Sequence, residues 1–180
     1  TTLFRSYIVM DNQIYGLTKG QTSPSSAKGF VTKSTPKGNI EKNVAPLELA
    51  LSSGATFVAQ GFSSDIKALT KMIEDAIHHD GFSFVNVFSP CVTYNKVNTY
   101  DWFKEHLTSI DDIEGYDNTD KQLAMKTVLD HESLVKGIVY QDTTTPSYES
   151  QISELEHEAL AKRDIHITEE TFNDLTAQFL

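Results

Sequence analysis

The chain has 180 residues, of which 39% are hydrophobic, and it carries a net charge of −10 and a single cysteine, Cys91. This length and hydrophobic content indicate a folded protein with a sizeable core, and one cysteine excludes an internal disulfide framework. The negative charge disfavours nucleic acid as a partner, and the apolar runs are too short to span a membrane.

The start of the chain predicts a fragment. It has no initiating Met, and Thr1–Ser6 is followed at once by a strand pattern, so we expect an upstream part to be missing and assign no function to Thr1–Ser6. No charged-then-apolar signal segment is present, and a cytoplasmic enzyme is therefore expected.

The first segments predict a strand, a long loop and a helix. The apolar run Tyr7–Met10 predicts a buried strand. Residues 13–45 are rich in Gly, Ser, Thr, Lys and Pro and predict a loop, and a loop of this length in a compact domain is usually functional. Pro46 is expected to begin a helix that stops at Gly54, and residues 55–59 predict a second strand.

A second helix and a third strand follow. Ser63 or Ser64 is expected to cap the helix, and Gly81 to end it. Its apolar residues are spaced by 3, 4 and 4 and predict one helical face: Ile66, Leu69, Ile73 and Ile77. The run Phe82–Phe88 predicts a strand that is buried on both faces.

This alternation of strands and helices predicts an α/β fold with a mostly parallel sheet flanked by helices. Ligands of such sheets bind at the carboxyl ends of the strands. Two segments are expected there, residues 11–16 after the first strand and residues 89–91 after the third.

The C-terminal part predicts helices and one more strand. Helices are expected at Tyr100–Leu107 and Asp120–Glu132, and a short strand at Lys136–Tyr140. From Gln141 onward the chain is polar and acidic, with a last helix near Glu169–Phe179.

Charge is unevenly distributed along the chain. Residues 12–47 contain five lysines and one acid, a balance of +4, at Lys19, Lys28, Lys33, Lys37, Lys42 and Glu41. Residues 110–180 contain sixteen acids and five bases, a balance of −11. One interpretation is a solvated basic loop and a solvated acidic tail, and the other is that the basic segment faces an anion.

Asp11 and Asn12 close the first predicted strand, and Gly16 and Gly20 follow. The Asn12 side chain offers an oxygen that suits Mg²⁺, and glycines allow the backbone to approach a diphosphate closely. An Asp-Asn pair after a strand is also a common turn, so both interpretations stay open on the residues alone.

Two longer segments carry a resemblance to a known family. Tyr7–Pro24 resembles the thiamine-diphosphate segment of 2-oxoacid:ferredoxin oxidoreductase β subunits, and Phe88–Asn95 is similar to a second signature of that family. Between them, Pro46–Ala50 and Gly54–Ala59 are also similar, and the resemblance extends over Tyr7–Tyr148. It implies the C-terminal half of a thiamine-diphosphate-binding fold over residues 7–107, with a family-specific, helical and acidic C-terminal extension over residues 108–180.

The resemblance implies a cofactor site. Asn12, through its side-chain oxygen, and Ile14, through its backbone carbonyl, would tie Mg²⁺ to the diphosphate, and the cofactor would be lined by Tyr15, Gly16, Leu17 and Thr18. Lys19 and Gln21 match positions near the catalytic centre. The family's Gly-Asp-Gly motif, which supplies a carboxylate to Mg²⁺, does not occur in this chain.

Cys91 has two interpretations. A lone cysteine in an apolar loop is usually an inert packing residue. The resemblance implies instead that it is the fourth ligand of a 4Fe–4S cluster whose other ligands lie outside this chain, because such a cluster needs four thiolates.

The resemblance further implies an oxidative decarboxylation of a 2-oxoacid, with 2-oxoglutarate favoured by overall similarity. Products would be acyl-CoA and CO₂, with electrons passing through the cluster to ferredoxin. The expected partners are the α subunit of the same enzyme in a heterodimer, ferredoxin, the 2-oxoacid and coenzyme A. The chain alone is expected to be inactive.

A different class of function stays open as the alternative. The absent Gly-Asp-Gly and the absent further cysteines would also suit a non-catalytic α/β interaction module derived from this family. A Gly-Asp-Gly and a Cys-x-x-Cys encoded upstream of Tyr7 would decide for the enzyme.

Overall fold

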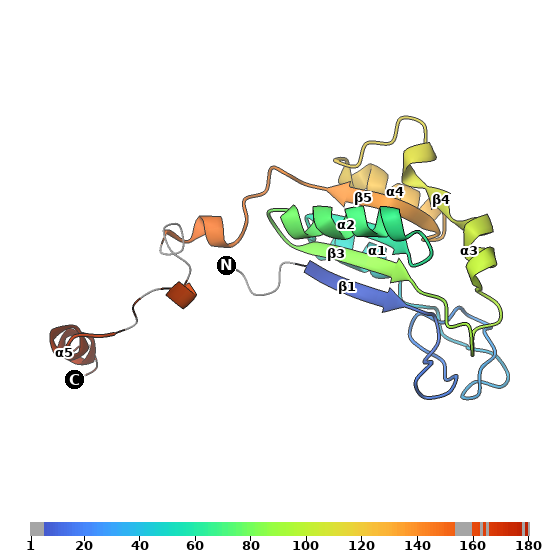
Figure 1. The fold of residues 1–180 in the computed structure, drawn as a ribbon, viewed down its shortest axis with the longest axis horizontal. Coiled ribbons are helices and arrows are strands. Elements are labelled where there is room, and N and C mark those ends of the chain that lie inside the picture. Colours follow the sequence, from blue (N-terminus) through green and yellow to red (C-terminus); the bar gives the residue numbers. More distant parts are fainter. Residues whose placement is uncertain (1–5, 154–159, 163, 165, 178, 180) are drawn as a thin grey trace. The chain divides into compact units, whose positions relative to one another are not determined.

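A five-stranded sheet lies at the centre of the fold, with the strand order β1-β3-β2-β5-β4 (Figure 1). In this computed structural model the described residues are 6–153, 160–162, 164, 166–177 and 179. The strands are β1 (Ser6–Asp11), β2 (Phe57–Phe62), β3 (Ser83–Phe88), β4 (Thr108–Ser109) and β5 (Val135–Gln141). The strands β1, β3 and β2 are parallel, as predicted, whereas β5 runs antiparallel to β2.

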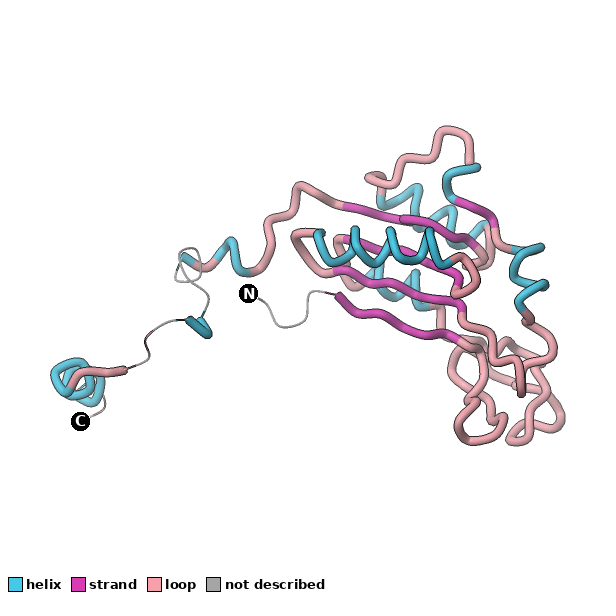
Figure 2. Tube along the Cα trace, in the orientation of Figure 1, coloured by secondary structure: helices cyan, strands magenta, loops and turns pink. Residues whose placement is uncertain are grey.

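Helices cover both faces of the sheet (Figure 2). On one face, α1 (Pro46–Ser52) and α4 (Lys121–Asp130) share a core with β2, β3 and β5, which includes Leu47, Leu51, Val58, Val128 and Val139. On the other face, Met72 and Ala76 of α2 (Ile66–His78) pack on β2 and β3, at Phe57, Ala59, Val85 and Val87. A smaller cluster joins Phe62 and Phe88 to Phe103 of α3 (Tyr100–His106).

Every residue of β3 is buried, which confirms the strand predicted as buried on both faces, although Phe82, its expected first residue, precedes it and is 44% exposed. β2 is also buried throughout, and it runs to Phe62, beyond the expected end at residue 59. The first strand was predicted as buried, and this was wrong. Among the described residues β1 pairs with β3 alone, so it is an edge strand, and Tyr7 and Met10 are 59% and 73% exposed.

The prediction for α2 was correct in extent and wrong in detail. Asp65 caps the helix instead of Ser63 or Ser64, because its side chain accepts a hydrogen bond from Ala68 N at 3.3 Å. Ile66 and Ile77 lie at the two ends of the helix and are exposed. The face that packs on the sheet carries Met72 and Ala76, together with Leu69 from the predicted face.

Contacts divide the chain into two units, one ending at Ser147 and the other beginning at Tyr148. The first unit contains the whole sheet, so it includes residues on both sides of the boundary expected after Leu107. In the second unit the described elements are two 3-10 turns, at Glu149–Gln151 and Leu160–Lys162, and α5 (Glu169–Ala177). No helix of the described residues is both long and apolar enough to cross a membrane.

Candidate functional site

The carboxyl ends of β1 and β3 lie side by side and start the two segments that the sequence singled out. Asp11 and Phe88 are partners in the parallel ladder, and Ser89 N donates to the carbonyl of Asp11 at 2.8 Å. Both segments then leave the sheet at its carboxyl edge, as the α/β order predicts.

The segment after β1 folds into a tight loop. The Asn12 side-chain oxygen accepts a hydrogen bond from Ile14 N at 3.2 Å, and Gln13 has a φ of 55°. Tyr15 and Gln21 form a bridge, with Tyr15 N donating to the carbonyl of Gln21 at 2.9 Å. This bridge closes a loop of five residues, 16–20, of which Leu17, Thr18 and Lys19 are exposed.

Backbone strain lies at the turn of this loop. Lys19 has a φ of 68° and Gly20 a φ of 96°, and Lys19 N and Gly20 N donate to the carbonyls of Gly16 and Tyr15. A left-handed conformation at a lysine costs on the order of 1 kcal/mol, and such costs gather at functional loops. Ile14 is buried, whereas Leu17 is 99% exposed, so the loop is anchored at its base and open at its tip.

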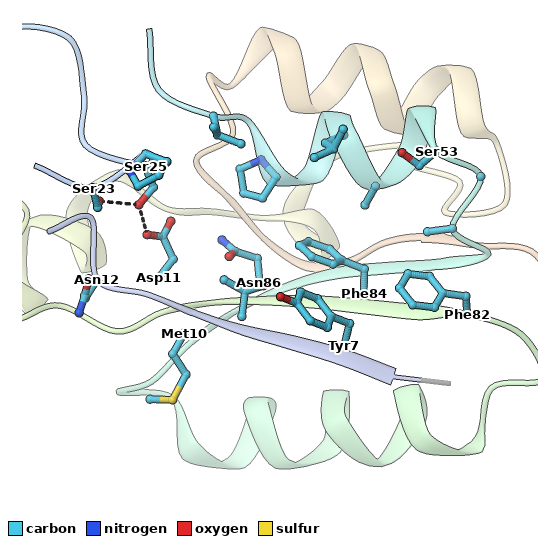
Figure 3. Close-up of a pocket in the computed structure, with 18 of the residues that line it drawn as sticks. Tyr7, Met10, Asp11, Asn12, Ser23, Ser25, Ser53, Phe82, Phe84 and Asn86 are labelled. Atoms are coloured by element: carbon cyan, nitrogen blue, oxygen red, sulfur yellow. Dashed lines mark hydrogen bonds between the residues drawn. The ribbon is translucent and has the colours of Figure 1, made fainter. Parts of the chain in front are cut away.

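Asp11, Ser25 and Ser26 hold the base of the loop. Ser25 donates from its hydroxyl to the Asp11 carboxylate at 2.6 Å (Figure 3). Gln13 N donates to the same oxygen at 3.0 Å. Ser26 donates to the carbonyl of Gln13 at 2.7 Å. Burial raises the pKa of the Asp11 carboxyl above its usual range, and the hydrogen bonds that it accepts from Ser25 and from Gln13 N partly oppose the rise.

The second segment forms a turn that packs on the first. Asn95 N donates to the carbonyl of Cys91 at 2.9 Å, and the Asn95 side-chain oxygen accepts from Val97 N and Asn98 N at 3.1 and 2.9 Å. The Asn95 amide donates to the carbonyl of Asn12 at 3.4 Å. Asn95 is 1% exposed, so its buried side chain links the two segments by hydrogen bonds.

Two glycines allow this close contact. A Cβ atom added at Gly16 would lie 3.1 Å from Cys91 Sγ and 3.9 Å from the Asn12 side-chain nitrogen. One added at Gly20 would lie 3.2 Å from the Tyr94 ring. The thiol of Cys91 is therefore in the immediate neighbourhood of the backbone that was predicted to line a cofactor.

A groove of about 620 Å³ runs beside β1, from the amino end of β3 to the loop (Figure 3). Aromatic and aliphatic side chains line most of it: Tyr7, Val9, Leu49, Phe82 and Phe84. Polar side chains gather at its loop end: Asp11, Asn12, Ser23, Ser25 and Asn86.

Two buried amides continue this polar end into the sheet. Gln60 donates to the carbonyls of Ser133 and Val135 at 2.6 Å each, and Asn86 donates to the Gln60 side-chain oxygen at 2.8 Å. The Asn86 side-chain oxygen is buried and has no hydrogen-bond partner within the described residues. Asn86 faces the side on which Asp11 lies (Figure 3).

The structure thus brings the predicted site residues of both segments into one region. Asn12, Gly16 and Cys91 are neighbours, Ile14 anchors the loop, and Tyr15 and Gln21 bridge its base. Asp11, Ser25 and Asn95 had no individual role in the site predicted from the sequence. Asn95 stands inside the second signature, whereas nothing in the serine-rich stretch distinguished Ser25 before the fold was known.

The donor set fits Mg²⁺ only in part. Asn12 and the backbone near Ile14 offer hard oxygens, but the neighbouring Asp11 carboxylate is turned to Ser25 and Gln13 N. Octahedral Mg²⁺ needs about six oxygens, so phosphate and residues elsewhere would supply the others. The described residues contain no group of three or more His, Cys, Asp and Glu side chains that could hold a metal.

Two family models match the chain. Residues 5–87 match the C-terminal thiamine-pyrophosphate-binding domain of thiamine pyrophosphate enzymes. Residues 91–157 match the C-terminal part of the pyruvate ferredoxin oxidoreductase β subunit. The boundary between the two matches falls just before Cys91.

Curated relatives include β subunits of 2-oxoacid:ferredoxin oxidoreductases. One from Sulfolobus sp is 39% identical over 155 residues, which is 81% of this chain and 51% of the relative. One from Saccharolobus solfataricus is 37% identical, over 82% of this chain and 52% of the relative. The chain therefore spans about half the length of these relatives.

A solved structure shares the fold. It is a 2-oxoglutarate:ferredoxin oxidoreductase from Magnetococcus marinus with 2-oxoglutarate, coenzyme A and succinyl-CoA bound. The TM-score is 0.80 at 32% sequence identity, and the match covers 94% of this chain and 57% of that chain.

Proposed function

The chain belongs to the family of 2-oxoacid:ferredoxin oxidoreductase β subunits, and we propose that it binds the diphosphate end of thiamine diphosphate in such an enzyme. The observation that carries this proposal is the contact between the two signatures. Gly16 lies against Cys91, and the Asn95 amide donates a hydrogen bond to the Asn12 carbonyl. One small region thus contains both the cofactor segment and the cysteine.

In this proposal each residue of the loop has a defined task. The Asn12 side-chain oxygen and the Ile14 carbonyl bind Mg²⁺ that is held by the diphosphate. Gly16 and Gly20 leave room for a close approach of the cofactor to the backbone, and Tyr15, Leu17 and Thr18 line it. When bound, thiamine diphosphate supplies the nucleophilic carbon for decarboxylation of a 2-oxoacid.

Lys19 and Gln21 would act on the substrate side of this loop. Lys19 is exposed next to Gly20, and its backbone is in a left-handed conformation. An ammonium group here would attract the carboxylate of a 2-oxoacid. Gln21 is held at the base of the loop by the bridge to Tyr15 and would contribute a neutral hydrogen bond.

Cys91 would bind a 4Fe–4S cluster as one of four thiolates. The chain has one cysteine, so the other three ligands would come from outside it. A thiol next to Gly16 would place the cluster beside the cofactor, which suits transfer of electrons between them.

The reaction would convert a 2-oxoacid and coenzyme A into acyl-CoA and CO₂, with ferredoxin as the electron acceptor. Two observations support 2-oxoglutarate as the substrate. Relatives are named 2-oxoglutarate oxidoreductase and 2-oxoglutarate synthase subunits, and the Magnetococcus marinus structure has 2-oxoglutarate bound. An α subunit would complete the enzyme. The assembled enzyme would be located in the cytoplasm.

The test is reconstitution of the full-length subunit with its α subunit. We expect turnover of 2-oxoglutarate, measured as CO₂ release with a dye acceptor, that needs thiamine diphosphate, Mg²⁺ and coenzyme A. Pyruvate and a branched 2-oxoacid serve as comparison substrates. If the assembled protein turns over none of the three although it binds the cofactor, the proposal fails.

A further inference from the structure

Large apolar side chains are exposed on the surface around Cys91. Val92 and Val97 flank the Cys91 turn and are 65% and 60% exposed, and Leu17 projects from the neighbouring tight loop. In the same long loop Val31 and Ile40 are 65% and 85% exposed. Single exposed apolar residues are common on proteins, but two on one turn, Val92 and Val97, beside the exposed Leu17 loop indicate an interaction site.

Two lysines, Lys33 and Lys96, contact the Cys91 turn. The Lys33 ammonium lies 5.7 Å from the centre of the Tyr94 ring, and Lys33 N donates to the carbonyl of Gly20. Lys96 donates from its ammonium to the carbonyl of Val92 at 2.5 Å. Both cations are therefore oriented by contacts with the Cys91 turn itself.

The two loop segments that contain Lys33 and Lys96 carry a charge opposite in sign to that of the rest of the chain. The two segments 12–45 and 89–99 contain six lysines and one acid, Glu41, which gives +5. The whole chain carries −10, so the remaining residues carry −15. Such a local reversal attracts acidic partners, and it acts on association rate more than on affinity.

The combination of exposed apolar side chains and lysines suits a protein partner better than a small anion. Lys33 and Lys96 do not line the apolar groove beside β1, and their neighbours Val92 and Val97 offer nothing to a phosphate. Apolar side chains with a charged rim are what a protein partner covers.

We propose that Val92, Val97, Lys33 and Lys96, here called the Cys91 patch, form the docking surface for an acidic, one-electron carrier protein. This inference rests on the proposed function, in which Cys91 binds the cluster where electrons leave. The balanced reaction is 2-oxoacid anion + CoA-SH + 2 oxidised carriers → acyl-CoA + CO₂ + H⁺ + 2 reduced carriers. Each turnover then requires two docking events, so fast and reversible association is an advantage.

The test measures binding and does not depend on turnover. Full-length subunit is assembled with its α subunit, immobilised, and exposed to an acidic ferredoxin at ionic strengths of about 0.01 M and about 1 M, where the Debye length is about 30 Å and about 3 Å. The variant is Lys33→Glu with Lys96→Glu. Lys33→Gln with Lys96→Gln serves as a milder second variant.

The matched control is Lys121→Glu with Lys126→Glu on α4. Both lysines are exposed, and the reversal of charge is the same, but α4 packs on a face of the sheet through Ala124 and Val128. We expect the patch variant to associate at least about tenfold more slowly than wild type at low salt and within about twofold of it at high salt. The Gln variant should lie between, and the control should match wild type within about twofold at both.

Three results would overturn the proposal. One is a patch variant with the wild-type rate and salt slope, and another is an equal loss in the α4 control. The third is loss of the α subunit from the patch variant, which would assign the patch to the subunit interface. Failure of the proposed function is seen separately, as absent dye-linked turnover in wild type, and leaves the binding result readable.

Discussion

Removal of the Asn95 side chain should loosen the contact between the two signature segments. In Asn95→Ala, Val97 N and Asn98 N lose the acceptor that lies 3.1 and 2.9 Å away, and the long bond to the Asn12 carbonyl is lost as well. At about 1 kcal/mol for each of the two shorter bonds, with a further cost for donors left partly buried, we expect a loss of about 2–3 kcal/mol in the free energy of unfolding.

The assay combines urea denaturation with hydrogen exchange of the backbone amides. Asn98→Ala is the control, because Asn98 takes part through its backbone N–H and keeps it in the variant. Amides of residues 12–16 and 95–98 should exchange faster in Asn95→Ala than in the control. A free energy of unfolding within about 0.5 kcal/mol of the control, with unchanged amide exchange in residues 12–16, would refute the role of Asn95 as the link between the two segments.

Other predictions concern single positions. Gly20→Ala should destabilise by about 1–2 kcal/mol more than Gly29→Ala, measured by urea denaturation, because both glycines have a positive φ but only Gly20 has the Tyr94 ring within reach of a Cβ atom. Burial raises the pKa of Tyr116 to about 12. Between about pH 10 and 12 tyrosine ionises in the unfolded chain but not in the folded one, so the free energy of unfolding of wild type should fall over that range. The stability advantage of wild type over Tyr116→Phe should shrink with it. Near pH 7 that advantage should be about 1 kcal/mol, from the bond of the hydroxyl to a β5 carbonyl. In the assembled enzyme, Cys91→Ser should lower the iron content and alter the spectrum of the reduced cluster while the circular dichroism stays unchanged; wild-type iron would remove Cys91 from the ligand set.

The sequence predicted the elements that have a strong local pattern. Continuous apolar runs predicted β2 and β3, and the proline and glycine signals predicted the bounds of α1. The α/β order predicted that residues 11–16 and 89–91 lie at one edge of the sheet. These features depend on neighbours in the chain, so composition and periodicity suffice to predict them.

Features that depend on distant partners could not be predicted in this way. The exposure of β1 follows from its position at the sheet edge, and the antiparallel direction of β5 follows from its pairing with β2. Ser25 lies 14 residues from Asp11 in the chain and meets it only because the long loop folds back. Hydroxyl-rich loops contain many such candidates, and no spacing rule selects one of them.

The most direct test of the account is the cofactor affinity of Asn12 variants in the assembled full-length enzyme, measured by calorimetry with thiamine diphosphate and Mg²⁺. Asn12→Leu removes the side-chain oxygen and should weaken binding by about 100-fold, or about 2.7 kcal/mol, because a hard cation loses a ligand. Asn12→Asp keeps an oxygen at this position and should stay within about tenfold of wild type. Equal affinity of wild type and Asn12→Leu would contradict the assignment of this loop as the Mg²⁺–diphosphate site.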